Sequence, residues 1–136
     1  MKKFALKRHQ RIKREAEFKE IMKKGKSYAD RYLVMYVLQK TSQINPVTCS
    51  SKSRAQEAES RLPRLGLSVG RRIGKAVIRN RIKRWIREVF RLHQFRLKDR
   101  MEIILIARSS ARELVDYFEM EKRILNLWGR ARIVRN

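Results

Sequence analysis

Basic side chains recur at helical spacing near the centre of the sequence. Successive members of the set are four residues apart, so on a helix they would form one stripe. The stripe consists of Arg79, Lys83, Arg87 and Arg91. It would be about 18 Å long at 1.5 Å per residue, and most of its members are arginines, whose planar guanidinium suits two-point binding of phosphate. The pattern therefore predicts a helix face that binds nucleic-acid phosphates.

The predicted contact set extends beyond this stripe. Asn80 can both donate and accept hydrogen bonds with a base edge or a ribose, and backbone flanked by Gly70 and Gly74 could bind phosphate ahead of the helix. Residues 71–91 contain nine Lys or Arg and a single acid. A solubilising surface helix is the alternative, but such helices usually alternate charge signs. The predicted residues are Arg71, Arg72, Lys75, Arg79, Asn80, Arg81, Lys83, Arg84, Arg87 and Arg91.

The helix that presents these residues should run from about residue 75 to residue 93. Its other face is apolar with the periodicity of a core-facing stripe, which would hold the basic face rigidly. These apolar positions are Ile78, Ile82, Trp85, Ile86, Val89 and Phe90.

Periodicity predicts the remaining elements around that helix. A helix is expected over about 14–24, with Gly25 as its stop, and strands over 32–38, 65–69 and 102–107. A last helix should begin after Asp116 as N-cap and end at Gly129. Both faces of the 32–38 strand are apolar, so each should pack against, or bind, something.

Composition indicates one folded, strongly basic domain spanning 1–136, with a long mobile loop at about 40–61. The net charge of +23 favours a polyanionic partner. Nucleic acid fits better than a membrane, because no apolar run approaches the roughly 20 residues that span a bilayer. A signal peptide is not evident and Cys49 has no partner for a disulfide, so we expect a cytoplasmic protein.

The sequence predicts no catalytic residue and no metal ligand. His9 and His93 are far apart and neither belongs to a group with metal-ligand spacing. The acids are scattered as helix-surface residues, without the carboxylate cluster or His-based pair that a nuclease needs.

The central segment also carries a family resemblance. RRIGKAVIRNRIKRWIREVFR (71–91), preceded by RLGLSV (64–69), resembles the RNR signature of the bacterial ribonuclease P protein family. RIKR (11–14), EF (17–18), GKS (25–27) and VMY (34–36) fall where that family places similar residues, as do 103–108 and the final helix. The resemblance covers most of the chain outside the loop.

This resemblance implies an α+β fold, an α/β sandwich. It would have a mixed four-stranded sheet packed with about three helices, and a left-handed βαβ crossover around the central helix. The basic helix would bind the catalytic RNA subunit, and a cleft between the first helix and the sheet would bind the 5′ leader of precursor tRNA. The implied leader-binding residues are Phe18, Met22, Ser27, Val34 and Tyr36. Met22 stands where many members have an aromatic residue, and plain core packing is the alternative for Phe18 and Tyr36.

The implied function is to assist removal of the leader, which gives the mature tRNA 5′ end. The expected partners are ribonuclease P RNA and precursor tRNA, with no obligate protein partner. The RNA subunit would perform catalysis and hold the Mg²⁺, and the protein alone would bind no cofactor. A ribosomal or other structural RNA-binding protein is the main alternative, and a protein-only nuclease is a third.

Overall fold

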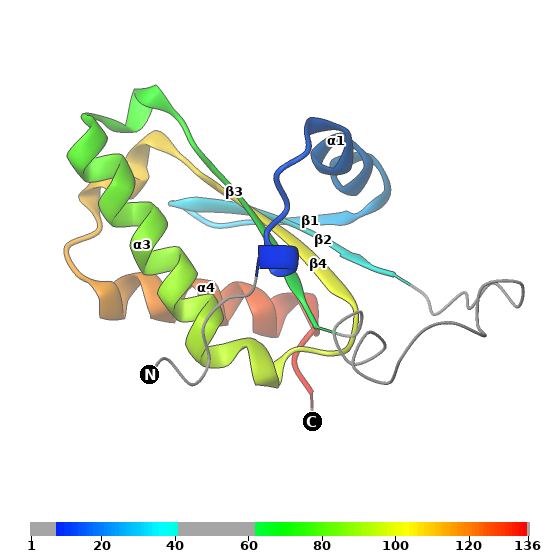
Figure 1. The fold of residues 1–136 in the computed structure, drawn as a ribbon. Coiled ribbons are helices and arrows are strands. Elements are labelled where there is room, and N and C mark those ends of the chain that lie inside the picture. Colours follow the sequence, from blue (N-terminus) through cyan, green and yellow to red (C-terminus); the bar gives the residue numbers. More distant parts are fainter. Residues whose placement is uncertain (1–7, 41–61, 136) are drawn as a thin grey trace, which may run out of the picture.

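A computed structural model describes residues 8–40 and 62–135 of the chain. Its centre is a mixed four-stranded sheet in the order β1-β2-β4-β3 (Figure 1). β1–β2 and β2–β4 are antiparallel pairs, and β3–β4 is parallel. The strands are β1 (Lys26–Ala29), β2 (Leu33–Gln39), β3 (Arg64–Val69) and β4 (Met101–Ala107); the helices are α1 (Glu15–Lys24), α3 (Ala76–His93) and α4 (Tyr117–Ala131).

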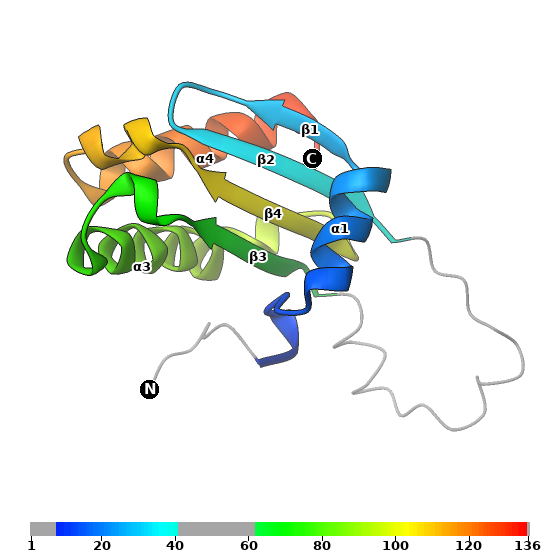
Figure 2. The same ribbon diagram turned by 90° about the horizontal axis from the view of Figure 1, so that it is seen from above.

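Both faces of the sheet are covered, as the two apolar faces of β2 predict. Leu33, Met35 and Val37 are buried in a large core that α3 and α4 complete. On the opposite face, Tyr36 and Leu38 pack against a smaller cluster that α1 completes. Figure 2 shows α1 on one side of the sheet and α3 and α4 on the other. The predicted α+β sandwich with its mixed four-stranded sheet is therefore confirmed.

The connection from β3 through α3 to β4 is left-handed. β3 and β4 lie side by side and run in the same direction, and α3 crosses behind them in Figure 2, on the face opposite α1. Nearly all such crossovers are right-handed. The unusual hand places α3 on the same face as α4 and leaves the other face to α1 alone.

The predicted last helix begins correctly but ends at the wrong residue. The Asp116 carboxylate accepts a hydrogen bond from the Glu119 N–H at 2.9 Å, as an N-cap does. Gly129 does not stop the helix, which continues to Ala131 and ends where Arg132 adopts φ of 56°. Because Ile133 and Val134 still pack against the core, the last turn is held in place by contacts that the glycine does not disturb.

The strand that periodicity missed is β1. It has only four residues, most of them exposed, and it pairs with β2 directly after α1 ends. Gly25 makes this possible through close approach: a Cβ there would lie 2.5 Å from the Val37 carbonyl oxygen and 2.6 Å from that of Ile21. Gly25 therefore stops α1, as predicted, and lets the chain turn tightly onto β2.

Nearly all of the predicted loop at about 40–61, including Cys49, lies outside the described residues. That loop and the single-domain organisation over 1–136 stay predictions. Within residues 8–40 and 62–135, no helix is both long enough and apolar enough to cross a membrane.

Candidate RNA-binding surfaces

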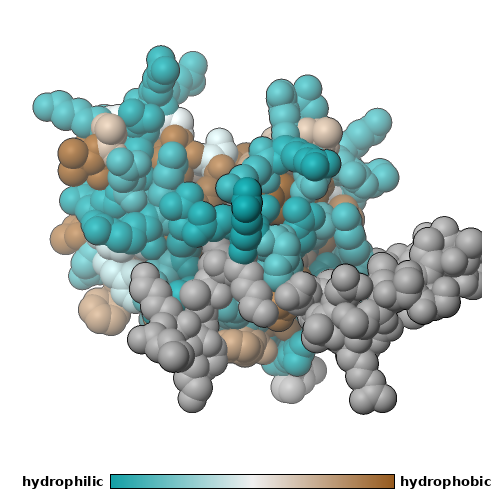
Figure 3. All heavy atoms as spheres, viewed as in Figure 1, coloured by the Kyte–Doolittle hydropathy of each residue, from teal (hydrophilic) through white to brown (hydrophobic). Residues whose placement is uncertain are grey.

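The first candidate surface is the outward face of α3. Ile82, Ile86, Val89 and Phe90 are fully buried on its inner side, which turns the polar residues outward. Ile78 and Trp85, predicted as core residues, are only partly buried and lie at the margin of the core. Hydrophilic residues cover much of the molecular face on which α3 lies (Figure 3).

The ten predicted α3-surface residues differ in how freely they meet solvent. The exposed members are Arg71, Arg72, Lys75, Asn80, Arg84 and Arg87, and the partly buried members are Arg79, Arg81, Lys83 and Arg91. The first three precede α3 or cap it, so the exposed set continues past the helix start. This set is the more accessible part of the predicted phosphate-binding face.

Two arginines of α3 already have partners inside the protein. Arg91 donates two hydrogen bonds to the Glu88 carboxylate, one of them from Nε at 2.9 Å, and this pairing raises the pKa of Arg91. The Arg81 guanidinium lies 5.0 Å from the centre of the Trp85 ring, within cation–π range. The predicted stripe is therefore not uniform, because Glu88 partly offsets the charge at its Arg91 end.

Arg87 faces another cation. Its pKa is lowered, first by partial burial and then by the nearby charge of Arg11. Arg11 and Lys13 come from the N-terminal segment, where the Ile12 N–H donates to the Leu65 carbonyl oxygen at 2.9 Å. The sequence prediction assigned no role to Arg11 and Lys13, although both belong to the RIKR stretch that resembles the family.

The second candidate surface lies between α1 and the sheet. Phe18 of α1 and Tyr36 of β2 pack around the same buried cluster and remain half-buried. Ser27 is opposite Tyr36 in the β1–β2 register, and Val34 is two residues along the same face of β2. Met22 is 40% exposed one turn after Phe18 on α1. All five predicted leader-binding residues thus lie on one side of the sheet.

Gly66 in β3 shapes this surface, and sequence reasoning missed it. A Cβ at Gly66 would lie 2.8 Å from Cζ of Phe18 and 3.3 Å from Cβ of Ile12. The absence of a side chain therefore lets the Phe18 ring approach the strand. A glycine between two apolar strand residues, Leu65 and Leu67, was the available signal, because glycine within a strand often marks such close approach.

Arg64 fastens α1 and the N-terminal segment to the sheet. Its guanidinium lies 2.8 Å from Oε2 of Glu17 on α1 and 3.2 Å from Oε1 of Glu102 on β4, and its Nε donates to the His9 carbonyl oxygen at 3.0 Å. Glu102 is buried and has a second cation, Lys40 Nζ, at 3.1 Å. This network fixes where α1 presents Phe18.

One histidine in the described part of the chain, His93, contacts an acid on a neighbouring helix. His93 Nε2 lies 3.2 Å from Oε2 of Glu121, which joins α3 to α4, and this contact holds the pKa of Glu121 below its ordinary value. Over residues 8–40 and 62–135, no three His, Cys, Asp or Glu side chains are grouped as a metal site would require.

Comparison with known proteins identifies similar chains over almost the full length. Residues 6–132 match the model of the family described as Ribonuclease P. The chain is 35% identical to the ribonuclease P protein component of Clostridium botulinum (strain Langeland), over 90% of this chain and 95% of that protein. It is 37% identical to the ribonuclease P protein component of Shouchella clausii, over 95% of this chain and 91% of that protein.

Solved structures are similar in fold as well as sequence. The Staphylococcus aureus RNase P protein superposes with a TM-score of 0.73 at 32% identity, covering 93% of this chain and 98% of that one. The RNase P protein from Thermotoga maritima gives a TM-score of 0.67 at 30% identity, over 88% and 96%. The family match over residues 6–132 includes α1, the sheet and α3, and therefore both candidate surfaces.

Proposed function

The chain belongs to the ribonuclease P protein family, and we propose that it presents two RNA-binding surfaces to the holoenzyme, one on α3 and one between α1 and the sheet. As a family member it is the RNA-binding protein component of ribonuclease P, a subunit of the enzyme that cleaves tRNA precursors. The relatives do not favour a ribosomal protein. The division of labour between the two surfaces is our proposal.

The placement of helices on the sheet is the observation that carries this proposal. α3 and α1 lie on opposite faces of one sheet (Figure 2), so the two surfaces are exposed at the same time. One RNA can therefore occupy α3 without excluding another from the α1 side. We assign the catalytic RNA subunit to α3 and the single-stranded 5′ leader of precursor tRNA to the α1 side.

The chemistry of each surface suits its proposed ligand. The arginines of α3 can bind phosphates at a fixed spacing, because the buried side of the helix is held rigidly in the core. Phe18 and Tyr36 supply rings on which unpaired bases can stack, and such stacking contributes about 1–3 kcal/mol per base. Arg64 and Gly66 position these rings without contacting RNA.

The protein assists hydrolysis of one phosphodiester by binding and by charge. In the proposed mechanism the RNA subunit holds Mg²⁺, which supplies an activated water and stabilises the leaving oxygen. Two folded RNAs repel each other, and a subunit of charge +23 reduces that repulsion. The residues of this chain hold the leader and the RNA subunit at a fixed distance from one another.

The direct test is reconstitution with a bacterial ribonuclease P RNA. We expect the purified protein to increase cleavage of precursor tRNA most at low Mg²⁺ and low salt, where screening by ions is weakest. Tight RNA binding without any change in cleavage would contradict the proposed function. Cleavage by the repurified protein in the absence of the RNA subunit would instead indicate a nuclease site in the protein.

The leader surface has its own test, Tyr36→Ala. We expect this change to weaken holoenzyme binding of precursor tRNA that carries a leader and to spare leaderless tRNA, because only the leader reaches the ring. Tyr36→Phe, which keeps the ring, is the control and should bind both substrates as wild type does. Equal losses on both substrates would show that Tyr36 serves the core only.

A further inference from the structure

We propose that Arg11, Lys13 and Arg87 form a pocket for one unstacked nucleotide of RNA, at the edge of β3 between the α3 surface and the α1 surface. The inference rests on the proposed function, because it requires RNA on this side of the molecule. It adds two residues, Arg11 and Lys13, to the RNA-binding set, and it makes the two surfaces continuous.

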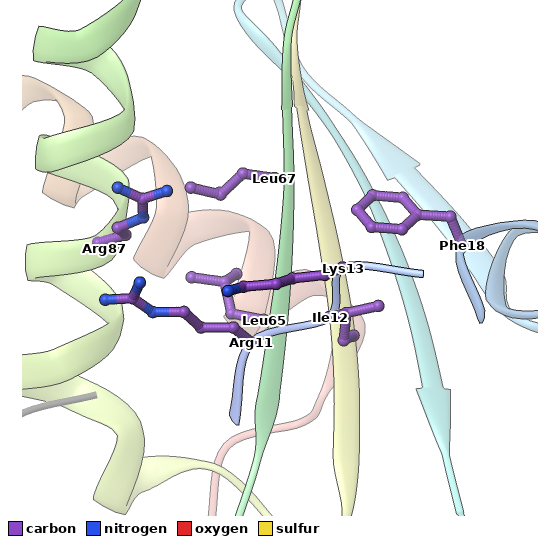
Figure 4. A pocket seen from close by; sticks show the side chains of 7 residues that line it. All are labelled: Arg11, Ile12, Lys13, Phe18, Leu65, Leu67 and Arg87. Atoms are coloured by element: carbon purple, nitrogen blue, oxygen red, sulfur yellow. The ribbon is translucent and has the colours of Figure 1, made fainter. Parts of the chain in front are cut away.

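The pocket is a cavity of about 280 Å³ between the N-terminal segment and α3. Figure 4 shows the Arg11 and Lys13 side chains extending toward α3, from which Arg87 extends in return. This volume is slightly below the roughly 300 Å³ at which small-molecule pockets begin, so we place only one base inside the cavity and its sugar and phosphate at the rim. The lining residues are Arg11, Ile12, Lys13, Phe18, Leu65, Leu67 and Arg87.

Backbone pairing directs the two cations into the pocket. Ile12 is buried, and its N–H bonds to the Leu65 carbonyl oxygen, so the segment runs extended along the edge of β3. Successive side chains of an extended segment alternate sides. With Ile12 turned into the small core, Arg11 and Lys13 on either side of it are turned the other way, toward Arg87.

The convergence of like charges points to an anionic ligand. None of the three cations forms an ion pair with a carboxylate in the part of the chain that the structure describes, and no acid lines the cavity. Arg87 is exposed but lies close enough to Arg11 for the charge of Arg11 to lower the pKa of Arg87, and this repulsion costs free energy for the isolated protein. A phosphate between them would turn that repulsion into two charge-assisted contacts.

The apolar lining of the pocket explains why the ligand is a nucleotide and not a free anion. Leu65 and Leu67 line the cavity on the α3 side of the sheet, and the Phe18 ring lines it on the α1 side. A base needs such a surface, and only an unpaired base exposes its faces to a protein. The ligand is therefore a nucleotide in a single-stranded stretch, either in the RNA subunit or in the leader of precursor tRNA.

The first experiment measures salt dependence with charge-removing variants. Arg11→Gln and Arg87→Gln should each reduce the log–log slope of RNA affinity against salt by about one unit, as expected for one lost phosphate contact. The double variant should reduce this salt slope by clearly less than the sum of the two single reductions, because both arginines hold the same phosphate. Lys122→Gln, which removes one exposed charge from α4, is the matched control, and thermal melting verifies that every variant folds.

Two arms identify which RNA supplies the nucleotide. One measures binding of the RNA subunit by the free protein, and the other measures binding of leader-bearing against leaderless precursor tRNA by the holoenzyme. 4-Thiouridine placed in either RNA should crosslink, in one arm only, to a peptide containing residues 11–13, 65–67 or 87. Arg11→Gln should abolish that crosslink.

The inference fails if the Arg11 and Arg87 variants have the same RNA affinity and salt slope as Lys122→Gln in both binding experiments, and if no crosslink reaches these peptides. Additive reductions of the salt slope in the Arg11→Gln and Arg87→Gln double variant would also overturn the inference, since they would indicate that the two arginines bind separate phosphates. These results leave the proposed function intact as long as wild-type protein stimulates precursor cleavage. Loss of that stimulation in the wild-type protein would instead defeat the proposed function itself.

Discussion

Single side chains decide which parts of the two RNA-binding surfaces are available. On α3, Arg84 is exposed, whereas Arg91 is bound to Glu88, three residues earlier on the same helix. On the α1 side, Phe18 reaches β3 only because residue 66 is glycine. Residues with the same chemical type in the sequence therefore differ in what they can bind.

The contrast between Arg84 and Arg91 gives a prediction about affinity for the RNA subunit. Arg84→Ala should reduce the log–log salt slope by about one unit, as loss of one phosphate contact does. Arg91→Ala should reduce it by clearly less, because Glu88 already offsets that charge. Binding titrations over a series of salt concentrations measure both slopes. Equal slopes for the two variants would show that RNA displaces Glu88 from Arg91.

Gly66→Ala tests how the leader surface is positioned. The added methyl must displace the Phe18 ring, so we expect weaker binding of leader-bearing precursor tRNA and a stability loss of about 1–3 kcal/mol from overpacking. Holoenzyme binding and denaturant unfolding measure the two effects. Gly70→Ala is the control, because its Cβ would meet no atom within 4 Å. Unchanged leader binding in Gly66→Ala would mean that Phe18 is not a leader contact.

At the scale of elements, short-range sequence signals compete with long-range packing. α4 passes through Gly129, a residue that ends many helices, because Leu127, Trp128 and Ile133 are buried around it. β1 forms from four residues with weak strand character, because α1 delivers them to the free edge of β2. In both places, packing rather than the local sequence fixes the element's bounds.

Gly129→Ala should stabilise the protein by about 0.5–1 kcal/mol. Gly129 lies inside α4, and a Cβ there would meet no atom within 4 Å, so alanine lowers the entropic cost of forming the helix without a clash. Ala131→Gly in the same helix is the reciprocal control and should destabilise by a similar amount. Urea unfolding measures both. A loss of stability in Gly129→Ala would mean that the helix ends at this residue in solution.

At the scale of the molecule, the sheet separates two helical layers, and positive charge far exceeds negative charge. The net charge of +23 is spread over a chain of 136 residues. Four of the nine ion pairs among the described residues join two exposed side chains, and such pairs contribute about 0–1 kcal/mol each. Self-repulsion therefore opposes folding of the free protein, and binding of RNA relieves it.

This balance predicts opposite salt effects on stability and on binding. Between about 0.01 M and 0.1 M salt the Debye length falls from about 30 Å to about 10 Å, so the melting temperature of the free protein should rise as repulsion is screened. RNA affinity should fall over the same range. Calorimetry and binding titrations measure the two trends. A melting temperature that decreases with salt would show that attractive ion pairs outweigh the repulsion.

The sequence by itself determined the amphipathic central helix, the buried strands and the polyanionic character of the partner. These depend on side-chain periodicity and net charge, which are local or additive properties. The family resemblance added the sandwich fold, the left-handed crossover and the residues of the α1 surface. The comparisons and the structure agree with that fold.

Only the tertiary structure decided which of these residues meet one another. The four-residue spacing predicted that Arg91 and Arg87 are equivalent members of one stripe. The structure shows instead that Arg91 is paired with Glu88, whereas Arg87 faces Arg11. Arg11 faces Arg87 because backbone pairing along β3 joins segments that are far apart in sequence. Gly66 matters because Phe18 arrives from another element. Such contacts depend on how elements pack in three dimensions, and one-dimensional patterns do not contain that information.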